Sequence, residues 1–248
     1  MKSILFFLLL VWSGCSFAQT LRVAVAANAQ FVMAPLKAAF QQQYGVQIES
    51  IVSSSGKLTT QIQQGAPFDV FLSADMDYPN ALHRQGLTST QPLVYAYGSL
   101  VLWTLSDLPL SADLRVLQNP LVRHIALANS ETAPYGAAAI SVLKHRKMLT
   151  SVQPRLVYGE SIAQVNQYVL SGAAEVGITA KSVVLDPALK GRGHWIDLPP
   201  PGYSPIAQGV VVLKRTDQPS AARQFIQFLR TPVARRLLQQ YGYRTPKP

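Results

Sequence analysis

The chain has 248 residues, of which 48% are hydrophobic and 14% charged, and its formal net charge is +10. This composition excludes a disordered or low-complexity protein, and the length suits one large α/β domain or two lobes of ordinary size. The basic excess is compatible with nucleic acid, an anionic membrane surface or a small anionic ligand. Because the Lys and Arg residues are scattered and do not interleave with aromatic residues, we expect no nucleic-acid partner.

The first 18 residues have the pattern of a secretory signal peptide. Lys2 precedes an apolar run, Ile4 to Val11, that is too short to span a bilayer, and small residues lead to a cleavage site after Ala18. Cleavage before Cys15, as in a lipoprotein, fits less well because Trp12 is too bulky for its place in that motif. Cys15 is the only cysteine, so the mature chain would have neither a disulfide nor thiol chemistry.

Strand-like and helix-like segments alternate along the mature chain, as in a protein built of βα units. In its first part we expect strands at 21–26, 46–52 and 68–73 and helices at 34–44, 57–64 and 76–85. The first helix would have Pro35 in its first turn, where proline is tolerated, and would end at Gly45. In the second part we expect a β-prone segment at 93–104 and strands at 125–128, 156–158, 176–180 and 206–213. We expect helices at 136–147, 220–230 and 232–241, and another that is capped by Ser161 and runs to 170.

Uncharged polar residues follow the first two predicted strands. Asn28 comes directly after the strand at 21–26, and Ser54 and Ser55 come after the strand at 46–52. Ligands of open α/β sheets bind at the carboxyl ends of the strands, and free N–H groups at a helix N-terminus suit an anion. Taken alone, each serine is equally well a helix cap and Asn28 a turn residue. Together they indicate a small oxyanion held by neutral donors.

Six short motifs then carry a family resemblance. They are Val-Ala-Val-Ala-Ala-Asn at 23–28, Ser-Ser-Ser-Gly-Lys-Leu at 53–58, Gly-Ala-Pro-Phe-Asp-Val-Phe-Leu-Ser-Ala-Asp at 65–75, Ala-Pro-Tyr-Gly at 133–136, Tyr-Gly-Glu-Ser-Ile at 158–162 and Glu-Val-Gly-Ile-Thr at 175–179. In their order and spacing they resemble the periplasmic molybdate-binding proteins of ABC importers, over nearly the whole mature chain.

The resemblance implies an α/β protein with the type II periplasmic-binding-protein fold, in which two α/β lobes are joined by a two-crossover hinge. Lobe 1 would comprise 19–97 and 206–248, and lobe 2 would comprise 98–205, with the crossovers near 96–100 and 204–208. Molybdate or tungstate would lie between the lobes, with no cofactor and no free metal cation, and would pass to an ABC permease in the inner membrane. We also expect a monomer, because no long amphipathic stripe is left over once the βα units are filled.

The same resemblance assigns the ligand-binding residues. In lobe 1 they are Asn28 and Ser55, with Ser54 and the backbone N–H of Ala27 as possible additions. In lobe 2 they are Tyr135 and the backbone N–H of Ile162.

One branch of the family has a tyrosine where this chain has Ala180. That branch usually has a smaller residue at position 135, so Tyr135 is expected to supply the hydroxyl from the other side.

Other classes of function are less well supported. His83, His124, His145 and His194 lack metal-ligand spacing, and neither a nucleophile-elbow motif nor a phosphate-cradling glycine loop is present, so we expect no enzyme. A receptor for another tetrahedral oxyanion such as sulfate, or a non-transport oxyanion sensor, remains an alternative. Molybdate and tungstate are both larger than sulfate, so we expect selection by cavity size. The carboxylates of Asp69 and Asp75 are assigned to turns and caps, and Glu160 to a capping or interlobe role.

Overall fold

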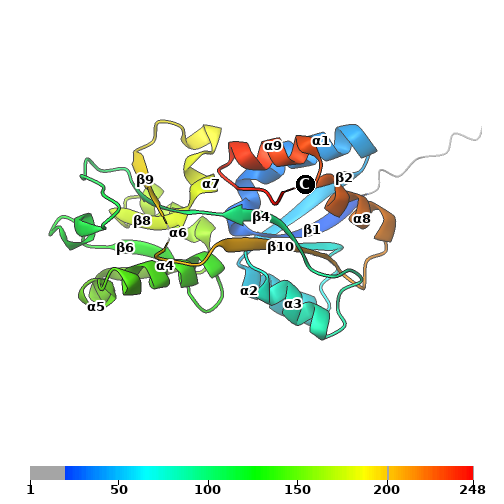
Figure 1. Cartoon of the computed structure of the whole chain (residues 1–248), viewed down its shortest axis with the longest axis horizontal. Coiled ribbons are helices and arrows are strands. Elements are labelled where there is room, and N and C mark those ends of the chain that lie inside the picture. The colour runs from blue at the N-terminus through cyan, green and yellow to red at the C-terminus, as the bar shows by residue number, and fades with distance from the viewer. Residues whose placement is uncertain (1–19, 200, 248) are drawn as a thin grey trace, which may run out of the picture.

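The computed structural model describes residues 20–199 and 201–247. The predicted signal peptide, its cleavage site and Cys15 lie outside these residues. The chain forms two five-stranded sheets, each with its own helices, and they lie side by side as two lobes (Figure 1). None of the helices described is both long and apolar enough to cross a membrane.

The first sheet has the strand order β2-β1-β3-β10-β4. Its strands are β1 (Thr20–Ala26), β2 (Gln47–Ser53), β3 (Val70–Ser73), β4 (Leu93–Gly98) and β10 (Ile206–Val212). The helices of this lobe are α1 (Gln30–Tyr44), α2 (Ser55–Gln63), α3 (Asp77–Arg84), α8 (Pro219–Phe228) and α9 (Pro232–Gln240). Strand β1 pairs in parallel with β2 and β3, whereas β10 runs antiparallel to β3 and β4.

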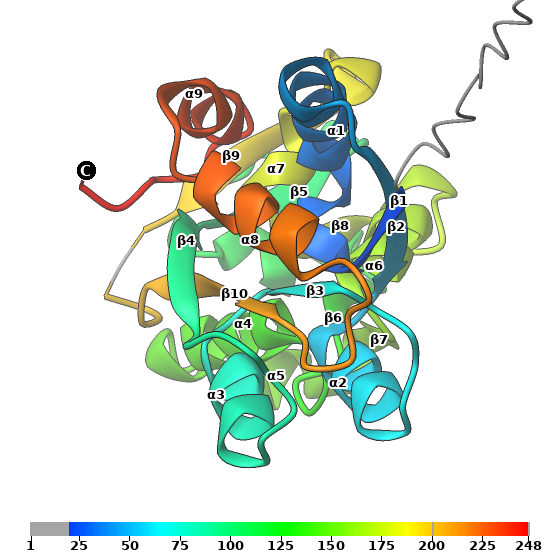
Figure 2. The same cartoon turned by 90° about the vertical axis from the view of Figure 1, so that its right-hand side faces the viewer.

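Helices cover both faces of this sheet. Figure 2 shows α1, α8 and α9 on one face and α2 and α3 on the other. Because successive side chains of a strand point to opposite faces, Val23 and Val25 of β1 join the core under α1 and α8, whereas Ala24 joins the core under α2. This double burial explains why the strand is apolar at consecutive positions.

The second sheet has the strand order β7-β6-β8-β5-β9. Its strands are β5 (Leu100–Thr104), β6 (Ile125–Ala128), β7 (Leu156–Gly159), β8 (Val176–Ala180) and β9 (His194–Leu198). The helices of this lobe are α4 (Pro134–His145), α5 (Leu149–Val152), α6 (Ile162–Leu170) and α7 (Lys181–Val184). A single large cluster of buried side chains, which includes Trp103 and Leu127, forms its core.

The chain crosses between the lobes twice. It leaves the first sheet at the end of β4 and enters β5 after the single residue Ser99, and it returns between the end of β9 and the start of β10. The β-prone segment at 93–104 thus forms two strands, β4 and β5, which belong to different sheets. The expectation of two α/β lobes is confirmed.

Two further predictions need correction. Helix α1 begins at Gln30, so Pro35 lies inside the helix rather than in its first turn. A proline there removes one backbone hydrogen bond, and the burial of Val32, Leu36 and Phe40 along the same helix compensates for that loss. The sequence patterns also missed β9 and the short helices α5 and α7, whereas Gly45 ends α1 in the left-handed conformation that was expected.

Candidate functional site

A small cavity lies where the loops at the carboxyl ends of both sheets meet. Its empty space amounts to about 200 Å³, which includes the part that is open to solvent. It is lined by Ala26, Ala27, Asn28, Ser54, Ser55, Ala74, Ala133, Pro134, Tyr135, Ser161 and Ile162. All six residues singled out from the sequence are in this lining. The structure thus brings them together from both lobes around a space that suits only a small ion.

The lobe 1 side of the cavity is formed by two helical N-termini. A 3₁₀ turn over Ala27–Ala29 follows β1, and α2 begins at Ser55 directly after β2. The two serines have different roles, because Ser54 caps α2 by accepting a hydrogen bond from the Lys57 N–H at 3.4 Å. The Ser55 hydroxyl instead accepts from the Ala74 N–H at 3.0 Å. Its own proton can therefore be donated to a ligand.

The lobe 2 side is also formed by two helical N-termini. Tyr135 is the second residue of α4, after Pro134, and Ile162 is the first residue of α6, after Ser161. The first N–H groups of a helix have no intrahelical acceptor, and proline has no N–H, so Tyr135 provides the first backbone donor of α4. Four segments thus direct the positive ends of their backbone dipoles toward one cavity, which favours a bound anion.

No charged side chain is among the described residues that line this cavity. Asp75, which follows the lining residue Ala74, has its pKa raised to about 6, because burial outweighs the hydrogen bonds from the Tyr78 backbone and from Ser73. Asp75 accepts a hydrogen bond from the Tyr78 N–H at 3.3 Å, which is the local capping role expected of it. Asp69 instead accepts from the Arg22 N–H and the Thr216 hydroxyl, which are 47 and 147 residues away, so it joins distant segments and the expected turn role is wrong for it.

Tyr135 reaches from the cavity to the crossover strands. Its side chain is buried, and a Cβ at Gly98, the last residue of β4, would overlap its hydroxyl. Burial raises the pKa of the Tyr135 phenol well above its usual value, and the neighbouring tyrosines raise it further. The hydroxyl is therefore neutral. It lies beside Gly98 on the crossover side of the site, and its expected role as a donor to the ligand stays a prediction.

Several contacts join the two lobes around the cavity. The Gly56 N–H donates to the Thr132 carbonyl at 2.9 Å, and the Tyr78 hydroxyl donates to the Glu131 carbonyl at 3.0 Å. Lys57 pairs with Glu160 at 2.5 Å, which gives Glu160 an interlobe role. These contacts join the two lobes on either side of the cavity.

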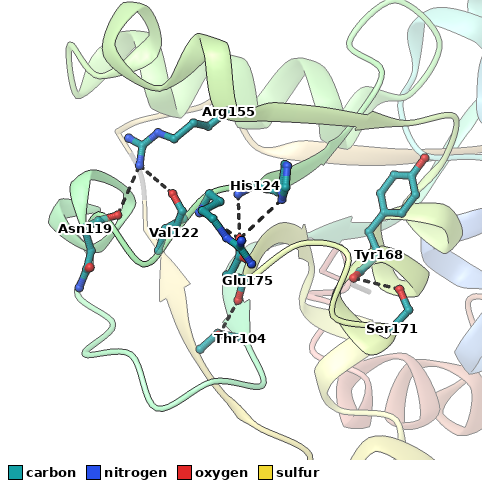
Figure 3. A network of polar contacts seen from close by, with 9 residues as sticks. Thr104, Asn119, Val122, His124, Arg155, Tyr168, Ser171 and Glu175 are labelled. Atoms are coloured by element: carbon teal, nitrogen blue, oxygen red, sulfur yellow. Dashed lines mark hydrogen bonds and ion pairs between the residues drawn. The ribbon is translucent and has the colours of Figure 1, made fainter.

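A second polar cluster surrounds Glu175, just before β8 of lobe 2 (Figure 3), and none of its residues lines the cavity. The Glu175 carboxylate accepts from the backbone N–H of His124 at 2.7 Å and of Arg123 at 3.0 Å, and its carbonyl accepts from the Thr104 hydroxyl at 2.6 Å. Burial acts to raise the pKa of Glu175, but these backbone hydrogen bonds outweigh it and the net shift is downward. The cluster fixes the turn before β6. Residues 20–199 and 201–247 contain no group of three His, Cys, Asp or Glu that could hold a metal ion.

A larger hollow, with about 1040 Å³ of empty space, lies in lobe 1 between β4, α8, α9 and the C-terminal residues. Its lining is apolar and basic and includes none of the motif residues. It is therefore not the site to which the sequence motifs point.

Comparison with known proteins gives concordant matches. The profile of the family described as bacterial extracellular solute-binding protein matches residues 21–244. The chain is 37% identical to the molybdate-binding protein ModA of Azotobacter vinelandii over 91% of this chain and 90% of that protein. It is also 37% identical to ModA of Rhodobacter capsulatus over 90% of this chain and 87% of that protein. The solved Azotobacter vinelandii periplasmic molybdate-binding protein superposes with a TM-score of 0.87 at 34% identity, over 92% of this chain and 100% of that one.

Proposed function

Since the chain belongs to the family of bacterial extracellular solute-binding proteins, we propose that it captures molybdate between its two lobes and delivers it to an ABC permease. One observation carries this proposal: four helical N-termini, two from each lobe, meet at a small cavity whose lining has no charged side chain among the residues described. The names of the curated relatives support the choice of molybdate.

The chemistry of the site favours a fully deprotonated tetrahedral dianion. Molybdate, tungstate and sulfate carry no proton at neutral pH, so a site for them needs donors only, whereas a protonated phosphate also needs an acceptor. The proposed donors are the Ser55 hydroxyl and the backbone N–H groups of Ala27, Asn28, Tyr135 and Ile162. A hydrogen bond to a charged group contributes about 1.5–3 kcal/mol, so a few such donors suffice for tight binding. Tungstate has the same charge and nearly the same size as molybdate, and we expect it to bind as well.

The lobe boundaries and the hinge belong to the same proposal. We place lobe 1 at 19–97 and 206–248 and lobe 2 at 98–205, and the assignment of β4 and β10 to one sheet and β5 and β9 to the other supports this division. Opening at the crossovers would separate the donors of lobe 1 from those of lobe 2, so the anion would stabilise the closed form through bonds that only this form completes. We further propose a periplasmic monomer whose signal peptide is cleaved after Ala18.

Thermal unfolding of the purified mature chain tests this function. After bound anions are removed, the chain is heated with molybdate, tungstate, sulfate or phosphate. A ligand at about a hundred times its dissociation constant stabilises the fold by about 2.7 kcal/mol, which a melting curve resolves. We expect a shift with molybdate and tungstate but not with sulfate or phosphate. A shift with sulfate alone would replace the molybdate receptor by a sulfate receptor, and no shift with any anion would reject transport of these oxyanions.

A further inference from the structure

Asn28 is the centre of a buried hydrogen-bond network that reaches beyond the ligand loops. Its side-chain Nδ2 donates to Gln208 Oε1 at 2.7 Å and to the Tyr243 hydroxyl at 2.9 Å. Its backbone carbonyl accepts from the Tyr243 hydroxyl at 2.8 Å and from the Ser182 hydroxyl at 2.6 Å. Both amide protons of the side chain are therefore engaged by protein partners, and the backbone N–H is the donor that Asn28 can offer to the cavity.

Gln208 joins Asn28 to the other ligand loop of lobe 1. Its Nε2 donates to the carbonyls of Ala74 at 3.1 Å and Ile206 at 2.9 Å, which fixes the orientation of the amide and turns Oε1 toward Asn28. The Ala74 N–H in turn donates to the Ser55 hydroxyl at 3.0 Å. Gln208 is fully buried on β10, so it holds Asn28 and the segment that supports Ser55 in one fixed relation.

Tyr243 reaches Asn28 from the C-terminal segment that follows α9. This segment is anchored on β4, where Tyr97 and Arg244 exchange backbone hydrogen bonds of 2.7 and 2.9 Å. Gly242, just before Tyr243, lies against α7 of lobe 2, because a Cβ there would be 2.8 Å from the Lys181 side chain. The segment thus touches β4, the ligand loop and a lobe 2 helix at once.

We propose that Tyr243 and Gln208 are positioning residues for the oxyanion site: they hold the loop at Asn28 so that its backbone donors keep the spacing that a molybdate-sized dianion requires. This inference rests on the proposed function. It makes the C-terminal segment part of the binding machinery, although it contributes no atom to the cavity lining.

The state of the Tyr243 hydroxyl supports this role. Burial raises the pKa of Tyr243 to about 12, against the opposing hydrogen bonds with Ser182, Asn28 and Tyr135. The hydroxyl therefore keeps its proton throughout the neutral range, and it donates to the Asn28 carbonyl while accepting from the Asn28 amide.

Tyr243→Phe tests the proposal, with Tyr95→Phe as the matched control. Tyr95 is a second buried tyrosine of this region, and its hydroxyl has no hydrogen-bond partner among the residues described. Dissociation constants for molybdate and sulfate are measured by calorimetry, and the unfolding of the anion-free proteins is followed in parallel. We expect Tyr243→Phe to weaken molybdate binding about five- to tenfold and to reduce the ratio of molybdate to sulfate affinity. Tyr95→Phe should leave both values unchanged.

The selectivity ratio separates a positioning role from a purely structural one. A general weakening of the closed form lowers the affinity for both anions by the same factor, whereas a loosened loop adapts to the smaller anion and lowers the ratio. An unchanged affinity or an unchanged ratio in Tyr243→Phe overturns the proposal. If that variant fails to fold, Gln208→Met, which removes the acceptor for Asn28 at similar side-chain length, is judged by the same two criteria. Failure of the unsubstituted chain to bind any oxyanion would instead reject the proposed function itself.

Discussion

Replacing Gly56 by alanine should impair closure of the lobes without harming the fold of either. Gly56 is the second residue of α2, and a Cβ at this position would lie 3.0 Å from Thr132 Cα and 2.8 Å from the Tyr78 hydroxyl. Ordinary carbon contacts begin near 3.4 Å, so the neighbours of the added methyl group must move away from it by a few tenths of an ångström. The end of the Tyr78 side chain can move, but Thr132 contributes backbone and belongs to lobe 2. The closed lobes must therefore separate slightly.

The size of the effect follows from this overlap. Overpacking typically costs about 1–3 kcal/mol, which corresponds to a loss of affinity of about five- to a hundredfold when it arises only in the closed form. In the open form the methyl group meets no lobe 2 atom, and alanine in a helix is favoured over glycine by about 0.5–1 kcal/mol. The anion-free variant should thus be at least as stable as the original chain, while its molybdate affinity falls.

Calorimetry with molybdate and thermal unfolding of the anion-free protein measure the two quantities. Gly202→Ala is the control, because the nearest atom to its Cβ is Val142 Cγ2 at 3.4 Å, an ordinary contact, and it is not in the cavity lining. An unchanged molybdate affinity in Gly56→Ala would refute the reasoning. So would an equal loss of anion-free stability, since the defect would then lie in the fold and not in closure.

Three further changes test the site and its surroundings. Ser55→Ala should weaken molybdate binding about tenfold or more, which is the scale of a lost hydrogen bond to a charged group. Ser54→Ala should mainly lower the unfolding free energy, by about 1 kcal/mol, because the helix cap is lost. Calorimetry and denaturant unfolding distinguish the two variants, and equal losses of affinity would contradict the assignment of Ser55 to the ligand and Ser54 to the cap. Glu160→Gln should reduce affinity less than about fivefold, and only at low salt, because both partners of its pair with Lys57 are half exposed; a salt-independent loss in a titration series would argue otherwise. The raised pKa of Asp75 means that the folded state holds this proton more tightly than the unfolded state, so the associated stability is present below pH 3.8 and is lost as pH rises through about 6. Asp75→Asn should therefore raise the unfolding free energy at pH 8 by about 1–2 kcal/mol, a value that is reduced for the partial exposure of the carboxyl group. At pH 3.5 the substitution should have no such effect. Equal effects in thermal melts at both pH values would show that ionisation of Asp75 is not the cause.

The fold was predictable where one element has one clear pattern. The short apolar strands β1, β6 and β8 and the glycine that ends α1 were identified because local residue types determine them. The segment at 93–104 was not resolved into β4 and β5, because its apolar pattern is continuous and only the tertiary structure assigns the halves to different sheets. Strand β9 was missed because its alternation of polar and apolar residues is short and lies between glycine-rich and proline-rich segments.

The candidate site divides in the same way. The residues that line the cavity lie at strand-to-helix junctions, and the sequence marks such junctions by serine, asparagine and proline. The sequence gives no such mark for the residues that hold this lining in place. Gln208 and Tyr243 are 180 and 215 residues from Asn28, on a strand and a C-terminal segment whose local sequences carry no sign of the loop that they contact. Only the assembled sheet places them there.

Under the proposed function, the contact at Gly56 offers a way for neutral donors to discriminate between anions of equal charge. Two lobes that are free to approach could tighten around a smaller anion and recover every hydrogen bond. Here the backbones of Gly56 and Thr132 already meet at 2.9 Å, and the absence of a side chain at Gly56 is what permits that distance. Further approach is blocked, so a sulfate ion would leave some donors of one lobe unpaired, at a cost of about 1–3 kcal/mol for each buried group. The same contact predicts that Gly56→Ala, by holding the lobes farther apart, should weaken sulfate binding more than molybdate binding. A calorimetric comparison in which both anions lose affinity equally would show that the contact between Gly56 and Thr132 does not set the selectivity between the two anions.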